Sequence, residues 1–354
     1  YFGRRNALFD LKIGTGVSAL VGSGLGGTSL INGGVAIDPP DEAFDSWPES
    51  KTGDWRCLLD ENADLVKKIL GVTKPNGEIN KHPDPGSIAK FRALQKLASA
   101  LGTNEPEAVP LAINFDDLTK NAIGQQQNKC INCGNCVTGC NIGAKNTLAM
   151  NVWPLVAQTG VKLFTGGKII ELIELSKEKD EYQWRVEVES VNDDVRSKVS
   201  VFAKKVILAA GTFGSTEILL RSNIKTSNKL GEYFSVNGDL MGFGYQANDK
   251  TDGFASTPSV YDDLRPQTTG PLTMSELRVE LPGDVTNGTV SFQDASIPYP
   301  MRRVLAETMS IGYLARLFGD NAKPEKPSID PHVIDDKVFM NSMAFTVMGR
   351  EKGY

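Results

Sequence analysis

The stretch VSALVGSGLGGTSLINGGVAI (residues 17–37) places closely spaced glycines among small and apolar residues. Its glycines Gly22, Gly24 and Gly27 formally satisfy the dinucleotide fingerprint G-x-G-x-x-G after a short strand-like run. That fingerprint opens a helix whose N-terminus holds a pyrophosphate, whereas the Gly-Gly pair at 33–34 would interrupt such a helix within two turns. The stretch therefore predicts a loop whose backbone approaches a flat or anionic ligand closely. A glycine-rich bend in a sheet is the alternative.

The composition is that of an ordinary globular protein. The chain has 354 residues, of which 40% are hydrophobic and 23% charged, with a net charge of −5. This charge gives no reason to expect a nucleic-acid partner, and no apolar run reaches the roughly 18 residues of a transmembrane span. We expect a cytoplasmic location. Because the chain begins at Tyr1 without Met and ends abruptly at MGREKGY, we also expect an internal fragment that lacks both ends.

Four of the five cysteines lie within eleven residues, in the spacing C-x2-C-x2-C-x3-C. This spacing is typical of a metal site rather than a disulfide framework. It matches the bacterial iron–sulfur run, except that Asn141 replaces the usual proline, and four thiolates would also suit zinc. An iron–sulfur cluster, a zinc site and a tightly packed loop of thiols all stay open. The candidate ligands are Cys130, Cys133, Cys136 and Cys140, or the first three with a distant cysteine such as Cys57.

Hydrophobic periodicity predicts helices over residues 60–70 and 87–101, the second capped by Ser87 and ended by Gly102. Alternating patterns predict strands within 161–175, near 184–188 and 199–203, and over 273–281 and 289–292. Residues 205–222 (KVILAAGTFGSTEILLRS) indicate a buried strand, a small-residue turn and a helix. Ligands bind at such strand-to-helix turns in α/β sheets.

Several separated segments together resemble the glucose–methanol–choline (GMC) oxidoreductase family, in its cholesterol-oxidase-like branch. The segments are GLGGTSLINGGVAIDPP with SWP, CINCGNCVTGCNIGAKNTLAMN, KKVILAAGTFGSTEILLRS, LGEYFSVNGD and VSFQDASIPYP. The resemblance implies an α/β (α+β overall) fold, with a three-layer FAD-binding domain and an antiparallel-sheet substrate domain, both incomplete here. It implies oxidation of the CH–OH group of an alcohol, sterol-like or other, by hydride transfer to the flavin.

The resemblance also implies a division of the chain and a set of cofactor contacts. Residues 1–40 and 126–234 would belong to the FAD-binding part, 41–125 to a cap or substrate segment, and 235–354 to the substrate domain. The N-terminal Rossmann unit and the C-terminal catalytic part would be missing. The implied cofactor-binding residues are Gly26, Gly27, Ser29, Asn32, Gly33, Val35, Gly167, Ala210, Gly211, Asn237 and Gly238.

The family's catalytic base is a histidine paired with an asparagine, and we expect it outside this chain. Of the two histidines, His82 and His332, both are expected to be solvent-exposed loop residues. Asp294 aligns with an acidic position that faces the substrate in cholesterol oxidases. We therefore expect the fragment to be inactive alone. The electron acceptor stays open between oxygen, a quinone and a protein, and the rival functions are an iron–sulfur or zinc electron-transfer module and a non-catalytic ligand-binding homologue.

Overall fold

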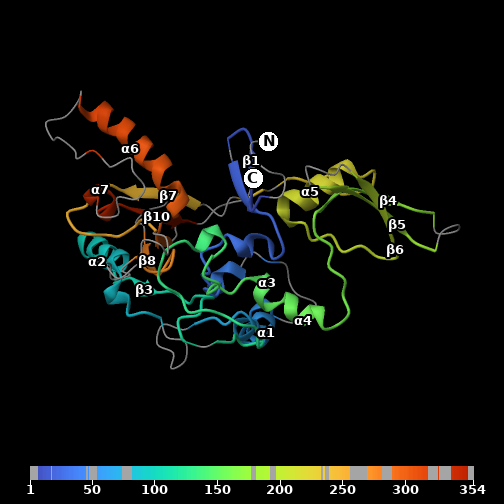
Figure 1. Ribbon diagram of the computed structural model, residues 1–354, viewed down its shortest axis with the longest axis horizontal. Coiled ribbons are helices and arrows are strands. Elements are labelled where there is room, and N and C mark those ends of the chain that lie inside the picture. The colour runs from blue at the N-terminus through green and yellow to red at the C-terminus, as the bar shows by residue number, and fades with distance from the viewer. Residues whose placement is uncertain are drawn as a thin grey trace. The chain divides into compact units, whose positions relative to one another are not determined.

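The computed structural model divides the chain into two compact units (Figure 1). The first unit comprises residues 1–28, 160–236 and 351–354, and the second comprises residues 29–159 and 237–350. The residues that the structure describes are 7–16, 18–44, 47, 54–73, 82–117, 119–176, 181–191, 197–232, 234–235, 239–255, 269–280, 289–317, 326 and 336–349.

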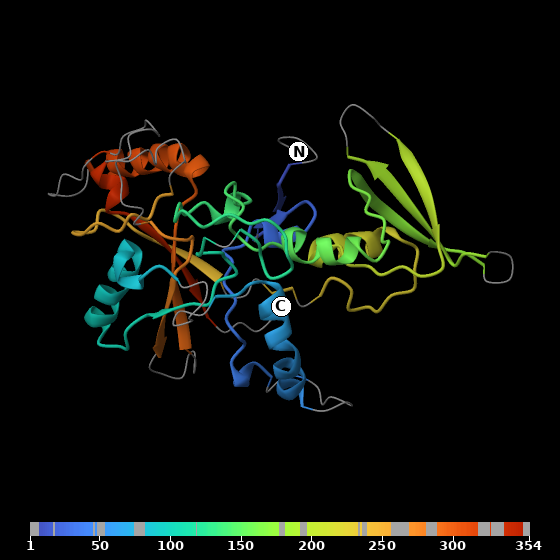
Figure 2. The same cartoon turned by 60° about the horizontal axis from the view of Figure 1, so that its bottom comes forward.

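The first unit contains two antiparallel sheets. Strands β1 (Phe9–Ile13) and β2 (Ser18–Gly22) form a hairpin that pairs Phe9 with Gly22. Strands β4 (Gly167–Glu174), β5 (Trp184–Ser190) and β6 (Lys198–Ala203) form the second sheet in that order, as Figure 2 shows. The strands predicted within 161–175, near 184–188 and near 199–203 are confirmed, the first of them over residues 167–174 only.

The strand predicted at the start of residues 205–222 does not form, whereas the predicted helix does. Helix α5 (Gly211–Arg221) packs against β4, but the chain before it has no strand structure and Ile207 is 92% exposed. A strand needs a neighbour to pair its N–H and C=O groups. No described strand pairs with residues 205–210, so the apolar run alone is not enough.

The second unit is built on a five-stranded antiparallel sheet in the order β3-β8-β9-β10-β7. The strands are β3 (Glu107–Ala108), β7 (Asp239–Gly244), β8 (Ser275–Glu280), β9 (Thr289–Ala295) and β10 (Met343–Met348). Helix α2 (Ala89–Leu101) packs on β8 and β9 (Figure 1), and it buries Leu94 and Ala98 against Leu277. The fold is therefore a mixture of helices and antiparallel sheets, as the sequence predicted.

The ends of the two long predicted helices follow local rules. Helix α1 (Trp55–Ile69) begins earlier than expected because the side chain of Asp54 accepts a hydrogen bond from Arg56 N. Helix α2 ends at Gly102, whose φ of 65° is the left-handed value that glycine adopts readily. Its N-cap is Ile88, without a side-chain hydrogen bond, so the predicted cap at Ser87 is wrong.

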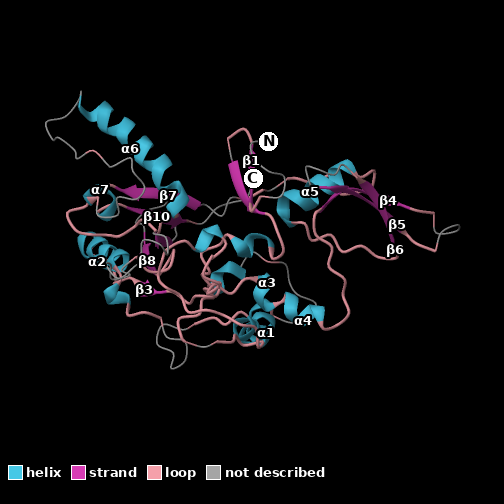
Figure 3. Ribbon diagram, in the orientation of Figure 1, coloured by secondary structure: helices cyan, strands magenta, loops and turns pink. Residues whose placement is uncertain are grey.

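The remaining helices of the second unit are short, apart from α6 (Arg302–Leu317). They are α3 (Leu148–Asn151), α4 (Trp153–Ala157) and α7 (Lys337–Met340), with single 3-10 turns that include Asp41–Phe44, Pro85–Ser87, Cys136–Thr138 and Tyr299–Met301. Residues 119–147 are mostly loop, as Figure 3 shows. None of the helices in the described part of the chain combines the length and apolar character that a membrane crossing requires.

Candidate functional site

The glycine stretch does not open a long helix. After β2 the chain makes only a one-turn 3-10 helix, Gly27–Leu30. Gly26 and Gly27 have φ values of 102° and 56°, which few other residues adopt without strain. The prediction that this stretch is not a Rossmann turn is confirmed.

A cavity of about 280 Å³ lies in the first unit, at the end of β2, the start of β4 and the start of α5. It brings together Gly167 and Ala210, two of the predicted cofactor-binding residues, which lie in separate segments of the chain. Gly22 also lines the cavity. It was not among the predicted cofactor-binding residues, because the fingerprint to which it formally belongs was rejected. The full lining is Asp10, Lys12, Val21, Gly22, Ser23, Gly167, Lys168, Ile169, Ala210, Phe213, Gly214, Glu217, Ile218 and Arg221.

Two glycines of this cavity are required by packing. A Cβ on Gly22 would lie 2.7 Å from the carbonyl oxygen of Gly27, and a Cβ on Gly167 would lie 2.8 Å from Val188 Cγ1. Both distances are shorter than real Cβ contacts. The glycines therefore keep the chain segments around the cavity close together, whatever ligand the cavity takes.

One wall of the cavity is charged. Lys12 Nζ lies 3.0 Å from Asp10 and 3.1 Å from Glu217, and Arg221 lies 3.5 Å from the same Glu217. Partial burial acts to lower the pKa of Lys12, but the hydrogen bonds to Asp10 and Glu217 outweigh it and raise that pKa. The lysine is therefore a fixed cation at neutral pH. Sequence reasoning missed this wall because its charged residues come from a hairpin and a helix far apart in the chain.

Helix α5 starts at the cavity wall. Its N-cap is Ala210, whose N–H donates to Ser215 Oγ over 3.0 Å, and the first turn holds no acidic residue. Gly211 has a φ of 74°, and a Cβ there would meet nothing within 4 Å. The N-terminus of a helix favours anionic groups, so this end of the cavity suits a phosphate.

The second half of the glycine stretch lies in the second unit. Ser29 Oγ accepts a hydrogen bond from Leu148 N, and Val35 pairs with Leu111 in an isolated bridge. Asn32 is exposed, and its side-chain oxygen accepts from Gly34 N over 3.2 Å. A Cβ on Gly33 would lie 3.1 Å from the side chain of Leu272. Contact of these residues with a cofactor stays a prediction, and Asn237 and Gly238 lie outside the described residues.

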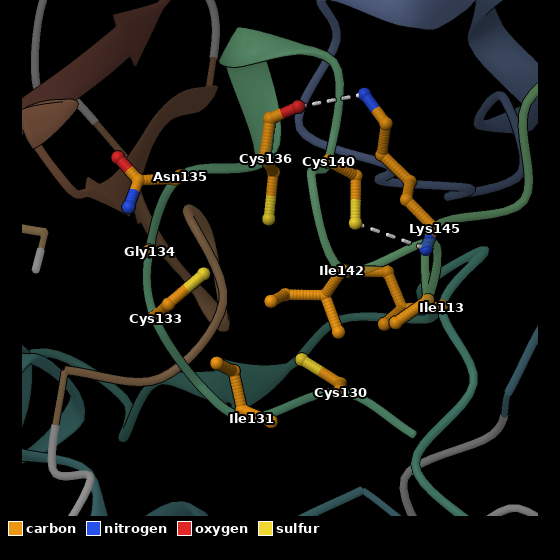
Figure 4. Close-up of a pocket in the computed structure, with 11 residues that line it drawn as sticks. Ile113, Cys130, Ile131, Cys133, Gly134, Asn135, Cys136, Cys140, Ile142 and Lys145 are labelled. Atoms are coloured by element: carbon orange, nitrogen blue, oxygen red, sulfur yellow. Dashed lines mark hydrogen bonds between the residues drawn. The ribbon is translucent and has the colours of Figure 1, made fainter. Parts of the chain in front are cut away.

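The four clustered cysteines line a single small cavity in the second unit, together with Ile113, Ile131, Gly134, Asn135, Ile142, Ala144 and Lys145. Figure 4 shows the four sulfur atoms directed toward the space that they surround. All four are free thiols, and Cys57 is an exposed thiol that does not line this cavity. The structure thus brings the four local cysteines together. Among the described residues, however, no three His, Cys, Asp or Glu side chains form a group that could hold a metal ion.

Burial controls the acidity of these thiols. It raises the pKa of Cys136 to about 11 and the pKa of Cys130 well above its ordinary value, and neighbouring thiols add to both shifts. The pKa of Cys133 is also raised, chiefly by burial. Lys145 acts to lower the pKa of Cys136, but burial outweighs it, and a thiol with a raised pKa is a poor nucleophile at neutral pH.

Lys145 ties the cysteine loop to the glycine loop. Its Nζ donates to the carbonyl oxygens of Leu30 and Asn32 over 2.9 Å each and to that of Cys136 over 2.8 Å. Burial lowers the pKa of Lys145, while Cys136 and Cys140 act to raise it. Through these three carbonyl partners the buried ammonium links the two loops.

Asp294 is completely buried. Its Oδ2 lies 3.0 Å from Nζ of the equally buried Lys90, and its Oδ1 accepts from Met274 N, Ser275 N and Ser275 Oγ. Lys90 Nζ also donates to two backbone carbonyls and to Ser296 Oγ. These contacts explain the burial of Asp294 without a substrate, so its catalytic role stays a prediction.

His82 lies in a loop, as expected, but it is buried, so the expectation that it is solvent-exposed is wrong. It is 7% exposed and packs against Phe115 with ring centroids 5.3 Å apart. Burial lowers the pKa of His82 to about 4. His332 lies outside the described residues.

Comparison with known protein families identifies the family of this chain. The family model of the GMC oxidoreductases matches residues 13–237, which is well over half of the sequence. The chain belongs to the GMC oxidoreductase family. The match includes the glycine stretch, the cysteine loop and the segments around Gly167 and Ala210.

Curated relatives agree with this family. A cholesterol oxidase of Acinetobacter baumannii is 24% identical over 277 residues, which cover 72% of this chain and 48% of the relative. A cholesterol oxidase of Mycobacterium tuberculosis is 26% identical over 219 residues, covering 58% of this chain and 36% of the relative. A long-chain-alcohol oxidase of Arabidopsis thaliana is 24% identical over 237 residues, covering 64% of this chain and 28% of the relative. The chain spans about half or less of the length of these relatives.

Proposed function

We infer that this chain is part of an FAD-dependent oxidoreductase that oxidises the CH–OH group of an alcohol. The observation that carries this proposal is the GMC family match over residues 13–237. The relatives are named for cholesterol and for long-chain alcohols, which supports a substrate with a large apolar part. When bound, FAD would accept the hydride from the alcohol carbon.

The cavity of the first unit fits part of such a cofactor. Its volume of about 280 Å³ is too small for a whole dinucleotide and suits one portion of it. Gly167 and Ala210 would give backbone contact without side chains in the way, and the start of α5 would face a phosphate. Lys12, which also lines the cavity, would add a cation there.

Alcohol oxidation also needs a base that removes the hydroxyl proton. Neither His82 nor Asp294 lines either described cavity, and both are buried. We therefore assign the base to neither of them. The work of the described residues would be to bind and orient the flavin.

The protein that carries this chain, purified aerobically, should be yellow, with flavin absorbance near about 370 and 450 nm. Acid extraction and chromatography would identify the released flavin as FAD. Anaerobic addition of cholesterol or a long-chain alcohol should bleach the 450 nm band, whereas glucose should not. A folded protein that contains no flavin and binds none on titration with FAD would refute the proposal.

A further inference from the structure

The four-cysteine loop is a built site that alcohol oxidation by a flavin does not require. Cys130, Cys133, Cys136 and Cys140 come from successive turns of one loop and face the same cavity (Figure 4). Apolar groups of Ile113, Ile131 and Ile142 close the rest of it. Cys136 also belongs to the hydrophobic core of the second unit, and Cys130 and Cys140 pack against that core.

Backbone N–H groups point at the sulfur atoms. Asn132 N lies 3.4 Å from Cys130 Sγ, Lys145 N lies 3.3 Å from Cys140 Sγ, and Leu272 N lies 3.4 Å from Cys136 Sγ. A neutral thiol is a weak acceptor, whereas a thiolate gains from each such donor. The donors therefore favour the charged form of sulfur, which is the form that binds metals. Hydrogen bonds to the cysteine sulfurs are also a feature that tunes iron–sulfur clusters.

The loop holds an unusual backbone to achieve this. Asn132 and Cys140 have φ values of 56° and 54°, in the left-handed region that non-glycine residues rarely adopt. Gly134 has a φ of 76°, and a Cβ there would lie 2.8 Å from Thr269 Cγ2. Such strain persists where the surrounding structure fixes it, and it concentrates at functional sites.

The four thiols line one small cavity, which raises the choice between a single zinc ion and a cluster. Thiolates around one zinc ion, each bound at about 2.3 Å, would lie about 3.8 Å from one another. The described residues contain no such group for a metal ion. In an iron–sulfur cluster each thiolate binds a different iron, so the four sulfurs stand further apart.

We propose that Cys130, Cys133, Cys136 and Cys140 hold an iron–sulfur cluster within this loop. The spacing C-x2-C-x2-C-x3-C is that of cluster-binding proteins, and here the fourth cysteine faces the same cavity as the first three. Cys57 takes no part. The four thiolates form the complete ligand set of one cluster.

Lys145 connects the proposed cluster to the loop that would contact the flavin. This part of the inference rests on the proposed function. Its Nζ joins the carbonyl of Cys136 to those of Leu30 and Asn32 in the glycine loop, which the family resemblance places along the flavin. The cluster and that loop are thus held in one fixed arrangement. Iron–sulfur clusters carry single electrons, so this arrangement favours a quinone or a redox protein over oxygen as the acceptor.

The test is metal analysis of the full chain, produced and purified without oxygen and with iron and cysteine supplied during growth. We expect iron and acid-labile sulfide in a ratio of about 1:1, and a broad absorbance near about 400 nm that dithionite bleaches. Cys133→Ala should lower the iron content at least about twofold. The matched control is Cys57→Ala, which removes the exposed cysteine and should leave the iron content unchanged.

Each other outcome overturns the proposal. Zinc without sulfide would make the loop a mononuclear site, and a metal-free protein with four thiols accessible to a thiol reagent after unfolding would make it a packed loop. The wild-type measurement decides this even where Cys133→Ala does not fold. Flavin bands are measured separately, so a protein with flavin but no iron would refute the cluster alone.

Discussion

Replacing Asp294 with alanine should destabilise the second unit by about 4 kcal/mol, because it leaves Lys90 buried without its ion-pair partner. The removed carboxylate also accepts hydrogen bonds from Met274 N and from the N–H and hydroxyl of Ser275. Removing one member of a buried pair costs about 3–5 kcal/mol, and the orphaned donors keep this site from falling at the lower end of that range.

The assay is urea denaturation followed by circular dichroism. At an m-value of about 2.5 kcal/mol per molar urea, a loss of 4 kcal/mol lowers the midpoint by about 1.6 M. Asp249→Ala is the matched control, because Asp249 pairs with Lys96 at the surface and both side chains are 62% exposed. Its effect should stay below about 1 kcal/mol. The double variant with Lys90→Met should recover part of the loss, since it removes the uncompensated charge.

A change of less than about 1 kcal/mol for Asp294→Ala would refute this reasoning. The conservative variant Asp294→Asn separates structure from catalysis. If it kept the wild-type urea midpoint and yet stopped flavin reduction by an alcohol, Asp294 would act in catalysis, as the family resemblance first suggested.

Three further predictions use the same unfolding measurements. Lys145→Met should cost about 3 kcal/mol because three carbonyls lose a charged donor, whereas Lys129→Met, at an exposed ion pair, should change stability by less than about 1 kcal/mol; equal effects would contradict the link between the loops. The unfolded chain protonates His82 near pH 6.5 and the folded chain near pH 4, so stability should fall by about 3 kcal/mol as pH drops through that window, and His82→Gln should remove that part of the pH dependence. Gly167→Ala should lower stability by about 2 kcal/mol through its contact with Val188, and adding Val188→Ala should restore it; a single variant with wild-type stability would show that the strand shifts freely.

Sequence reasoning succeeded where the deciding interactions are local. The glycine pair at 33–34 excluded a long helix because each glycine costs helix stability within its own turn. Gly102 ended α2 for the same kind of reason, since only its own φ had to be left-handed. The apolar run at 205–210 wrongly predicted a strand, because a strand depends on a partner strand that the local sequence does not reveal.

The sequence by itself determined the family, the end of α2 at Gly102 and the close spacing of the four cysteines, because these depend on residue types at short separations. Only the tertiary structure decided which groups meet. Lys145 finds two of its acceptors 115 and 113 residues away, and the cavity of the first unit joins Gly22, Gly167 and Ala210. The family resemblance predicted that Asp294 faces a substrate. In the structure it is buried and forms an ion pair with Lys90. Charge and burial of such groups are set by distant partners, which no local pattern contains.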